Sequence, residues 1–370
     1  MLKKIDFFYI FILITCFWVI VYLKSPHVFS WKFDPNLINL YKRSQDITHE
    51  VEGRVHLSDN DVYIATGYLY ANGEDPTKYN FQHPPLIKYL FGVSTILTGN
   101  PYLVQLLFSA FYIFLTYLLG LKMFKVRKIA VLSTIFLASD PLLRSVTSEA
   151  LLDLGQATFS LGYLISTLFY PSGLILQGLL LGLFSASKFW STALLFFFFI
   201  YGYKKFVIKE KLNYKNIFYI LVIAALTFSL TYFRSFINLG GKFNIVFFQL
   251  KILKYMIQHN SAPILGGQIL LFLTGYFFKW WDEIKIVKSD IFNLLWPVSF
   301  VSGFLVLKEG LRKGLPGIIF LLPIVYFFFT ITQVPFTRYF LLVLPYLYIS
   351  LSYLIWKFFN KNKSKKIFWV

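Results

Sequence analysis

Carboxylate side chains are concentrated in residues 34–75 of an otherwise largely apolar chain. Eight of its seventeen acidic residues fall within this part: Asp34, Asp46, Glu50, Glu52, Asp59, Asp61, Glu74 and Asp75. Asp59 and Asp61 stand out because His83 and two prolines follow them. A carboxylate can act as a general base on a hydroxyl nucleophile. Residues 58–92 are therefore the candidate reactive segment, although a solvated loop is the ordinary explanation for most of these acids.

Further charged residues stand at separate places along the chain: Arg144, Glu149, Asp153, Lys188 and Arg338. Lys188 and Arg338 either bind a phosphate or extend to lipid headgroups. Arg144 has the same two interpretations, and the structural one is favoured. Glu149 and Asp153 have the spacing of neighbours on one helix face. They either hold a divalent metal ion or pair with a lysine, and the second role is favoured.

The composition is that of a membrane protein. Hydrophobic residues make up 57% of the 370 residues and charged residues only 14%, with a mean hydropathy of +0.63. Soluble domains carry about a quarter charged residues. We therefore expect an all-α polytopic protein, with residues 1–370 as a single integral-membrane domain. The net charge of +19 comes largely from lysines in short gaps between apolar runs. This pattern is typical of cytoplasmic loops and indicates a lipid bilayer, not nucleic acid, as the partner.

Apolar runs of membrane-spanning length recur along the whole chain. The first run has no small-residue cleavage site after it, so we interpret it as an uncleaved span. The sequence predicts about ten spans, at residues 7–23, 102–121, 129–138, 149–170, 174–187, 189–203, 217–233, 291–307, 317–331 and 340–356.

The distribution of basic residues predicts the orientation of these spans. Both termini are expected in the cytoplasm, which places residues 24–100 outside as the first extracytoplasmic loop. Residues 84–97 should form a helix on the membrane surface, because proline suits a first helical turn. Residues 234–290 form a second extracytoplasmic region. Whether residues 264–278 span the membrane is ambiguous, and the positive-inside rule favours a segment that does not. All the candidate residues then lie at the outer face.

Several motifs together resemble the GT-C superfamily of glycosyltransferases. They follow in the family's order: an acid-rich first outer loop, HPPL at 83–86, SEALLD at 148–153, QGLLLGLFSASKFW at 177–190 and RYFLLVLPYL at 338–347. In particular, the chain resembles the dolichyl-phosphate-mannose protein mannosyltransferases. The resemblance implies a GT-C-type transmembrane bundle whose first extracytoplasmic loop contains membrane-surface helices.

The same resemblance implies a reaction. A hexose, with mannose as the expected sugar, moves from a polyprenyl- or dolichyl-phosphate carrier to a hydroxyl acceptor on protein or lipid, as in protein glycosylation. An aspartate is the general base, and a single displacement inverts the anomeric centre. Asp61 is the first choice for the base and Asp59 the second. The expected donor-phosphate ligands are His83, Lys188, Arg338 and Arg144.

Two other functions remain open. A membrane transporter or a lipid-linked-sugar flippase would have ionisable residues near the membrane midplane, whereas the middles of the predicted spans are nearly free of charge. A non-catalytic scaffold would leave the aspartate pair and His83 unexplained. His83 itself either contacts the donor phosphate or only caps the helix that follows it.

Overall fold

The computed structural model describes residues 2–47, 53–259, 264–279 and 285–360 and is almost entirely helical. Within these residues each of the ten predicted spans coincides with a helix. These helices are α1 (Lys4–Lys24), α6 (Tyr102–Phe124), α7 (Arg127–Ser139), α9 (Asp153–Phe169), α10 (Leu174–Ser187), α11 (Trp190–Phe206), α12 (Tyr214–Leu230), α16 (Leu295–Arg312), α17 (Pro316–Phe329) and α18 (Leu344–Phe359). The prediction of a polytopic helical bundle is confirmed.

Part of the bundle has the length and apolarity of membrane segments. α1 and α6 have 21 and 23 residues and are apolar enough to cross a bilayer unaided, since about 20 residues span the hydrocarbon. α7 and the following α8 (Pro141–Thr147) pass the same test together, with a 60° bend between them. α10, α12 and α17 are shorter apolar helices. The chain is therefore an integral membrane protein.

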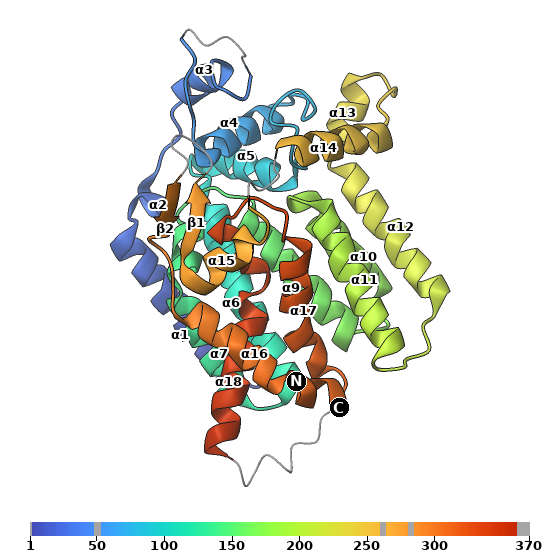
Figure 1. Ribbon diagram of the computed structural model, residues 1–370. Helices are drawn as coiled ribbons and strands as arrows, with labels where there is room; N and C mark the ends of the chain where they lie inside the picture. The colour runs from blue at the N-terminus through green and yellow to red at the C-terminus, as the bar shows by residue number, and fades with distance from the viewer. Residues whose placement is uncertain (1, 48–52, 260–263, 280–284, 361–370) are drawn as a thin grey trace.

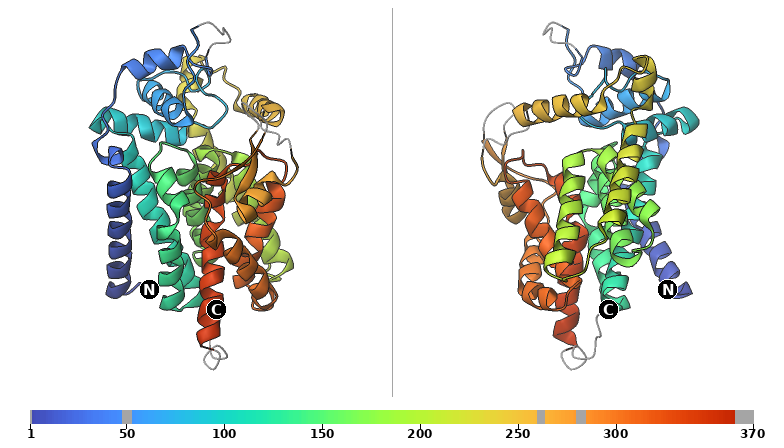
Figure 2. Two further views of the ribbon diagram at one scale, coloured as in Figure 1. Left: turned by 60° about the vertical axis from the view of Figure 1, so that its left-hand side comes forward. Right: turned by 90° about the vertical axis from the view of Figure 1, so that its right-hand side faces the viewer.

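A layer of short helices lies across one end of the bundle (Figures 1 and 2). We call this layer the head. It consists of α3 (Asn36–Lys42), α4 (Asp59–Ala71), α5 (Leu86–Thr98), α13 (Phe233–Asn238) and α14 (Ile245–His259). α5 is the helix predicted at residues 84–97. α1 begins and α18 ends at the opposite end of the bundle, and the lysine-rich tail beyond α18 lies outside the described residues. A four-residue helix, α2 (His27–Ser30), leads from α1 toward the head.

The ambiguous segment at residues 264–278 contains only a short helix. α15 (Gly267–Thr274) has eight residues, about 12 Å at the usual rise, which is too short to cross a membrane. Gly266 and Gly275 bound it with φ of 78° and 79°, a backbone conformation that favours glycine. An antiparallel hairpin follows, β1 (Tyr276–Lys279) and β2 (Lys285–Lys288), with Tyr276 opposite Lys288. These strands were not predicted from the sequence.

The expected i, i+4 relationship between Glu149 and Asp153 on one helix is wrong. α8 ends at Thr147 and α9 begins at Asp153, so Glu149 lies in the intervening turn. The amide of Gln105 holds this turn open by donating hydrogen bonds to the carbonyls of Glu149 (2.5 Å) and Leu151 (2.8 Å). Backbone acceptors taken up by a side chain are not available to a helix. The fourth span accordingly starts four residues later than predicted.

One buried acid serves the packing of the bundle. The Asp140 carboxylate accepts hydrogen bonds from the Trp296 indole at 2.8 Å, the Asn293 amide at 3.2 Å and the Tyr348 hydroxyl. It also caps α8 through the Leu142 N–H. These hydrogen bonds compensate the buried charge of Asp140. They also join the bend between α7 and α8 to α16 and α18.

Candidate active site

The first turn of α4 separates the two aspartates that the sequence put forward. Ser58 caps α4: its hydroxyl accepts the Asp61 N–H at 3.2 Å and donates to Asp61 Oδ2 at 2.9 Å. The Asn60 amide donates to Asp61 Oδ1 at 3.0 Å. Asp61 is therefore bound into the start of the helix, because its N–H and its carboxylate both bond to the Ser58 hydroxyl. Asp59 takes no part in these bonds.

Asn60 fixes this turn to the bundle. Its side-chain oxygen accepts hydrogen bonds from the Tyr102 hydroxyl at 3.1 Å and from the Ala150 N–H at 2.7 Å. These bonds join the start of α4 to the start of α6 and to the turn before α9. The sequence analysis did not single out Asn60. Residues 58–61 have the Ser-x-x-Asp pattern of a helix start. This pattern could have indicated that Ser58 and Asp61 cap α4, and that Asn60 has a different role.

Four of the predicted site residues form one chain of ion pairs, which we call the ion cluster: Asp59, Arg338, Asp153 and Lys188. Arg338 Nη2 lies 2.7 Å from Asp59 Oδ2, and its Nε lies 3.8 Å from Asp153 Oδ2. Lys188 Nζ lies 2.7 Å from Asp153 Oδ1. Asp153 and Lys188 are buried, whereas the Asp59 side chain is 50% exposed. The cluster thus alternates in charge and ends in an accessible carboxylate.

Aromatic rings hold the two cations in place. The Arg338 guanidinium lies 4.5 Å from the centre of the Phe336 ring. The Lys188 ammonium lies 4.6 Å from the Tyr339 ring and 5.2 Å from the Phe189 ring. Arg338 and Tyr339 belong to the 3₁₀ helix η1 (Thr337–Leu342), and Lys188 follows α10 directly. Contacts of this kind favour a cation that has little access to water.

The charges of the cluster act on one another. Burial lowers the pKa of Lys188 to about 8, against the opposing pull of Asp153. Burial also opposes the charge of Arg338, but Asp153 and Asp59 outweigh it and raise the pKa of Arg338. Glu149 lies near the same charges: desolvation and the carboxylate of Asp59 raise the pKa of Glu149, although Arg338 opposes them. Of the two cations in the ion cluster, Lys188 is therefore the one whose positive charge is more costly to maintain.

His83 lies beside the cluster with an unused nitrogen. Its ring packs edge-on against Phe189 and Tyr63, at centroid distances of 5.0 and 6.1 Å. Its Nδ1 is shielded from solvent and has no hydrogen-bond partner among the described residues. Burial, and then the charges of Lys188, Lys88 and Arg338, hold the pKa of His83 well below its ordinary value. α5 has Pro85 at its N-cap and no side-chain cap, so His83 does not cap this helix.

A buried lysine fixes the segment that carries His83. Lys88 Nζ donates to the carbonyls of Asn80 at 2.6 Å and His83 at 3.0 Å. Asp46 binds the same segment from the other side, accepting the Asn80 N–H at 3.1 Å and its amide at 3.0 Å. Sequence reasoning missed this role of Lys88. Lys88 is the single charged residue of the apolar helix α5, and this position could have indicated a buried structural role.

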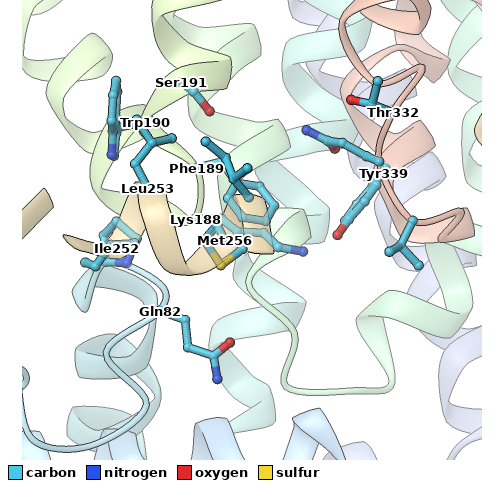
Figure 3. Close-up of a pocket in the computed structure, with 14 residues that line it drawn as sticks. Gln82, Lys188, Phe189, Trp190, Ser191, Ile252, Leu253, Met256, Thr332 and Tyr339 are labelled. Atoms are coloured by element: carbon cyan, nitrogen blue, oxygen red, sulfur yellow. The ribbon is translucent and has the colours of Figure 1, made fainter. Parts of the chain in front are cut away.

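A cavity of about 210 Å³ opens from the Lys188 end of the cluster (Figure 3). The Lys188 ammonium and the Tyr339 hydroxyl point toward one another there. α14 supplies an apolar wall with Ile252, Leu253 and Met256. The cavity thus combines a cation with apolar walls, which suits an amphiphilic molecule with an anionic group.

The remaining predicted ligands are not brought into the ion cluster. Arg144 lies in α8, and no hydrogen bond or ion pair of its side chain occurs among the described residues. Across the same residues, no group of three or more His, Cys, Asp or Glu side chains is placed to hold a metal ion. Asp153, one of the proposed metal ligands, is instead paired with Lys188 and faces Arg338.

The fold has known counterparts, although no family profile and no curated protein sequence matches the chain. ArnT from Cupriavidus metallidurans, in a crystal structure bound to undecaprenyl phosphate, superimposes with a TM-score of 0.58 at 16% identity over 91% of this chain. The apo structure of the same protein gives a TM-score of 0.58 at 18% identity over 91% of this chain. The chain spans about three fifths of the length of these proteins, 60% and 59% respectively. ArnT is a GT-C glycosyltransferase. The chain is therefore a polytopic membrane protein that shares the fold of these ArnT structures.

Proposed function

We propose that the protein is an integral-membrane glycosyltransferase that moves a hexose from a polyprenyl-phosphate carrier to a hydroxyl acceptor. The fold supports this proposal, as does the binding of undecaprenyl phosphate by ArnT. The observation that carries it is the ion cluster, in which an accessible carboxylate, Asp59, is connected through Arg338 and Asp153 to a buried ammonium at a cavity. A glycosyl transfer needs a base at one end of its reaction axis and positive charge at the other.

Asp59 is the general base in this mechanism. Arg338 holds one of its oxygens, and the half-exposed carboxylate can take the proton of an acceptor hydroxyl as that hydroxyl attacks the anomeric carbon. Asp61, the first choice from sequence, is less suited because the α4 cap occupies both of its oxygens. One displacement forms the new glycosidic bond and breaks the bond to phosphate, so it inverts the anomeric centre.

Lys188 stabilises the departing phosphate, and His83 helps to bind the phosphate of the donor. An ammonium has three N–H donors, and Asp153 accepts one from Lys188, which leaves the others free to face the cavity. The unused Nδ1 of His83 provides a second polar contact nearby. Positive charge and donors placed where an anion develops lower the barrier to its release. Arg338, which already faces two carboxylates, orients the base and contributes positive charge between the two ends.

The substrates follow from the chemistry of the cavity and from the sequence resemblance. The apolar wall of α14 next to Lys188 suits the prenyl part of the carrier, whether undecaprenyl or dolichyl. Mannose is the proposed sugar, and the acceptor is a hydroxyl on protein or lipid. In this proposal the head and the ion cluster face the extracytoplasmic side and both termini lie in the cytoplasm.

The test is a transfer assay with the full chain reconstituted in liposomes. Labelled polyprenyl-phosphate mannose, glucose and galactose are supplied in turn, and label is counted separately in protein and lipid acceptor fractions. We expect transfer from one of these donors, its loss in Asp59→Asn and its retention in Asp61→Asn. Movement of the labelled lipid between leaflets without any glycoside product would instead identify a flippase and contradict the proposal.

A further inference from the structure

A second cavity lies at the end of the bundle opposite the head. Its volume is about 770 Å³, within the range of ligand pockets. The start of α1, the end of α6, the start of α7, the end of α9 and the start of α17 surround it. The cavity shares no residue with the ion cluster or with the cavity at Lys188.

The charges that line this cavity are mostly uncompensated. Its cations are Lys3, Lys122, Lys125 and Arg127, and Asp6 is the only acid among its described lining residues. Asp6 is fully used: Arg127 Nε lies 2.6 Å from Oδ1, the Tyr117 hydroxyl donates to Oδ1 at 2.7 Å, and the Lys3 backbone N–H donates to Oδ2 at 2.7 Å. Within the described part of the chain, the three lysine ammonium groups therefore have no carboxylate partner.

Two aromatic rings hold Lys122 at the wall of the cavity. Its ammonium lies 4.5 Å from the centre of the Tyr170 ring and 5.6 Å from that of Phe169. A ring face orients a cation but does not neutralise it. Lys125 follows at the end of the same helix and is exposed. The two cations thus stand three residues apart with no anion beside them.

The rest of the lining is apolar. Leu118, Leu121, Leu168, Phe169 and Leu315 complete the wall beside the lysines. A free phosphate ion would gain from the cations but would leave this wall in contact with water. A phosphate attached to hydrocarbon chains would use both parts of the cavity, and basic pockets between membrane helices bind anionic headgroups in this way.

We propose that this cavity binds the phosphate headgroup of an anionic phospholipid, with Lys122, Lys125 and Lys3 around the phosphate and the acyl chains along the apolar wall. The inference does not depend on the glycosyltransferase proposal. It gives the protein an anion site at the end of the bundle opposite the ion cluster, where a bound lipid joins the start of α1 to α6 and α7.

Native mass spectrometry of the detergent-solubilised full chain tests the proposal. Dioleoylphosphatidylglycerol, dioleoylphosphatidylcholine and free glycerol phosphate are titrated separately, and bound molecules are counted. We expect one phosphatidylglycerol to bind preferentially, and its affinity to fall roughly tenfold or more in Lys122→Ala/Lys125→Ala, because each lysine near an anionic headgroup contributes substantially. Lys122→Arg/Lys125→Arg should retain binding. Lys211→Ala/Lys215→Ala, which removes one exposed lysine just before α12 and one from its first turn, is the matched control.

Three results would overturn the proposal. Equal affinity for phosphatidylcholine would show that charge is not recognised. Free glycerol phosphate binding as tightly as the lipid would identify a soluble anion as the ligand. An equal loss of affinity in the Lys211/Lys215 control would show general attraction to a basic surface. The transfer assay of Asp59→Asn is independent of all three outcomes.

Discussion

Asp59 and Arg338 lie 279 positions apart in the chain, and their side chains meet at 2.7 Å. Arg338 contributes a second nitrogen toward Asp153, which in turn binds Lys188 at 2.7 Å. The accessible carboxylate is therefore oriented by a residue that also faces the buried part of the cluster. This arrangement leads to predictions that separate catalytic from structural roles.

Asp59→Asn should reduce sugar transfer to background, because an amide cannot accept the acceptor proton. Asp61→Asn should keep most of the activity and cost about 1 kcal/mol of stability, the usual effect of weakening a helix cap. Initial rates in liposomes and thermal unfolding in detergent measure the two effects. Full activity in Asp59→Asn, or inactivity in a well-folded Asp61→Asn, would reverse the assignment of the base.

Asp153→Asn should lower the free energy of unfolding by about 3 kcal/mol or more, because it leaves the Lys188 ammonium buried without its carboxylate. Lys188 is only 1% exposed at this position. Adding Lys188→Met to Asp153→Asn should recover part of the lost stability, whereas transfer should remain absent. Thermal unfolding of the two variants provides the comparison. A double variant less stable than Asp153→Asn would contradict the buried ion pair.

His83→Ala should raise the KM for the lipid-linked donor more than it lowers kcat, because the unused Nδ1 is assigned to donor binding. His56→Ala is the control, since His56 is exposed and belongs to the same loop region. Steady-state kinetics with varied donor concentration measure both constants. An unchanged KM in His83→Ala would return His83 to a packing role.

Gly92→Ala should destabilise the head by about 1 to 3 kcal/mol, the usual cost of overpacking. α4 and α5 touch at Gly67 and Gly92, and a Cβ on Gly92 would overlap the Gly67 carbonyl. The displaced α4 would carry Asp59 away from Arg338, so activity should fall as well. Gly202→Ala in α11 is the control: a Cβ there meets no atom within 4 Å, and alanine favours the helix. Equal stability of the two variants would argue against close packing of α4 on α5.

Lys88 should make the stability of the protein depend on pH. Burial lowers the pKa of Lys88 to about 7, with Asp46 opposing, from an ordinary value of 10.5. Between these values the unfolded chain binds more protons than the folded one, so stability rises with pH, by at most about 1.4 kcal/mol per pH unit. Lys88→Met should remove this slope. Unfolding at pH 7 and pH 9 tests it, and equal slopes in both proteins would contradict the assignment.

The spans were predictable because the bilayer requires apolar runs of a certain length, and such runs can be recognised directly in the sequence. Span length and polarity could not predict the different roles of the two aspartates in the first turn of α4. Asp59 and Asp61 have the same chemistry, and only the Ser58 cap directs one of them into the helix start. The turn at Glu149 depends on Gln105, which belongs to another helix. Such contacts join distant parts of the chain and have no local pattern.

The β1–β2 hairpin was missed for a different reason. The apolar residues of β1 follow those of α15 directly in the sequence, so the two elements look like one apolar segment. Gly275, with its positive φ, marks the change of backbone direction between them. The buried role of Lys88 was likewise hidden, because its acceptors are backbone carbonyls of the preceding segment. A sequence shows which side chains are present, but not which main-chain groups a fold leaves unpaired.

The ion pair between Asp59 and Arg338 cannot form until the 279 positions that separate the two residues have been synthesised. If the protein is the proposed glycosyltransferase, a polypeptide that stops before η1 has the Asp59 carboxylate but not the guanidinium that orients it.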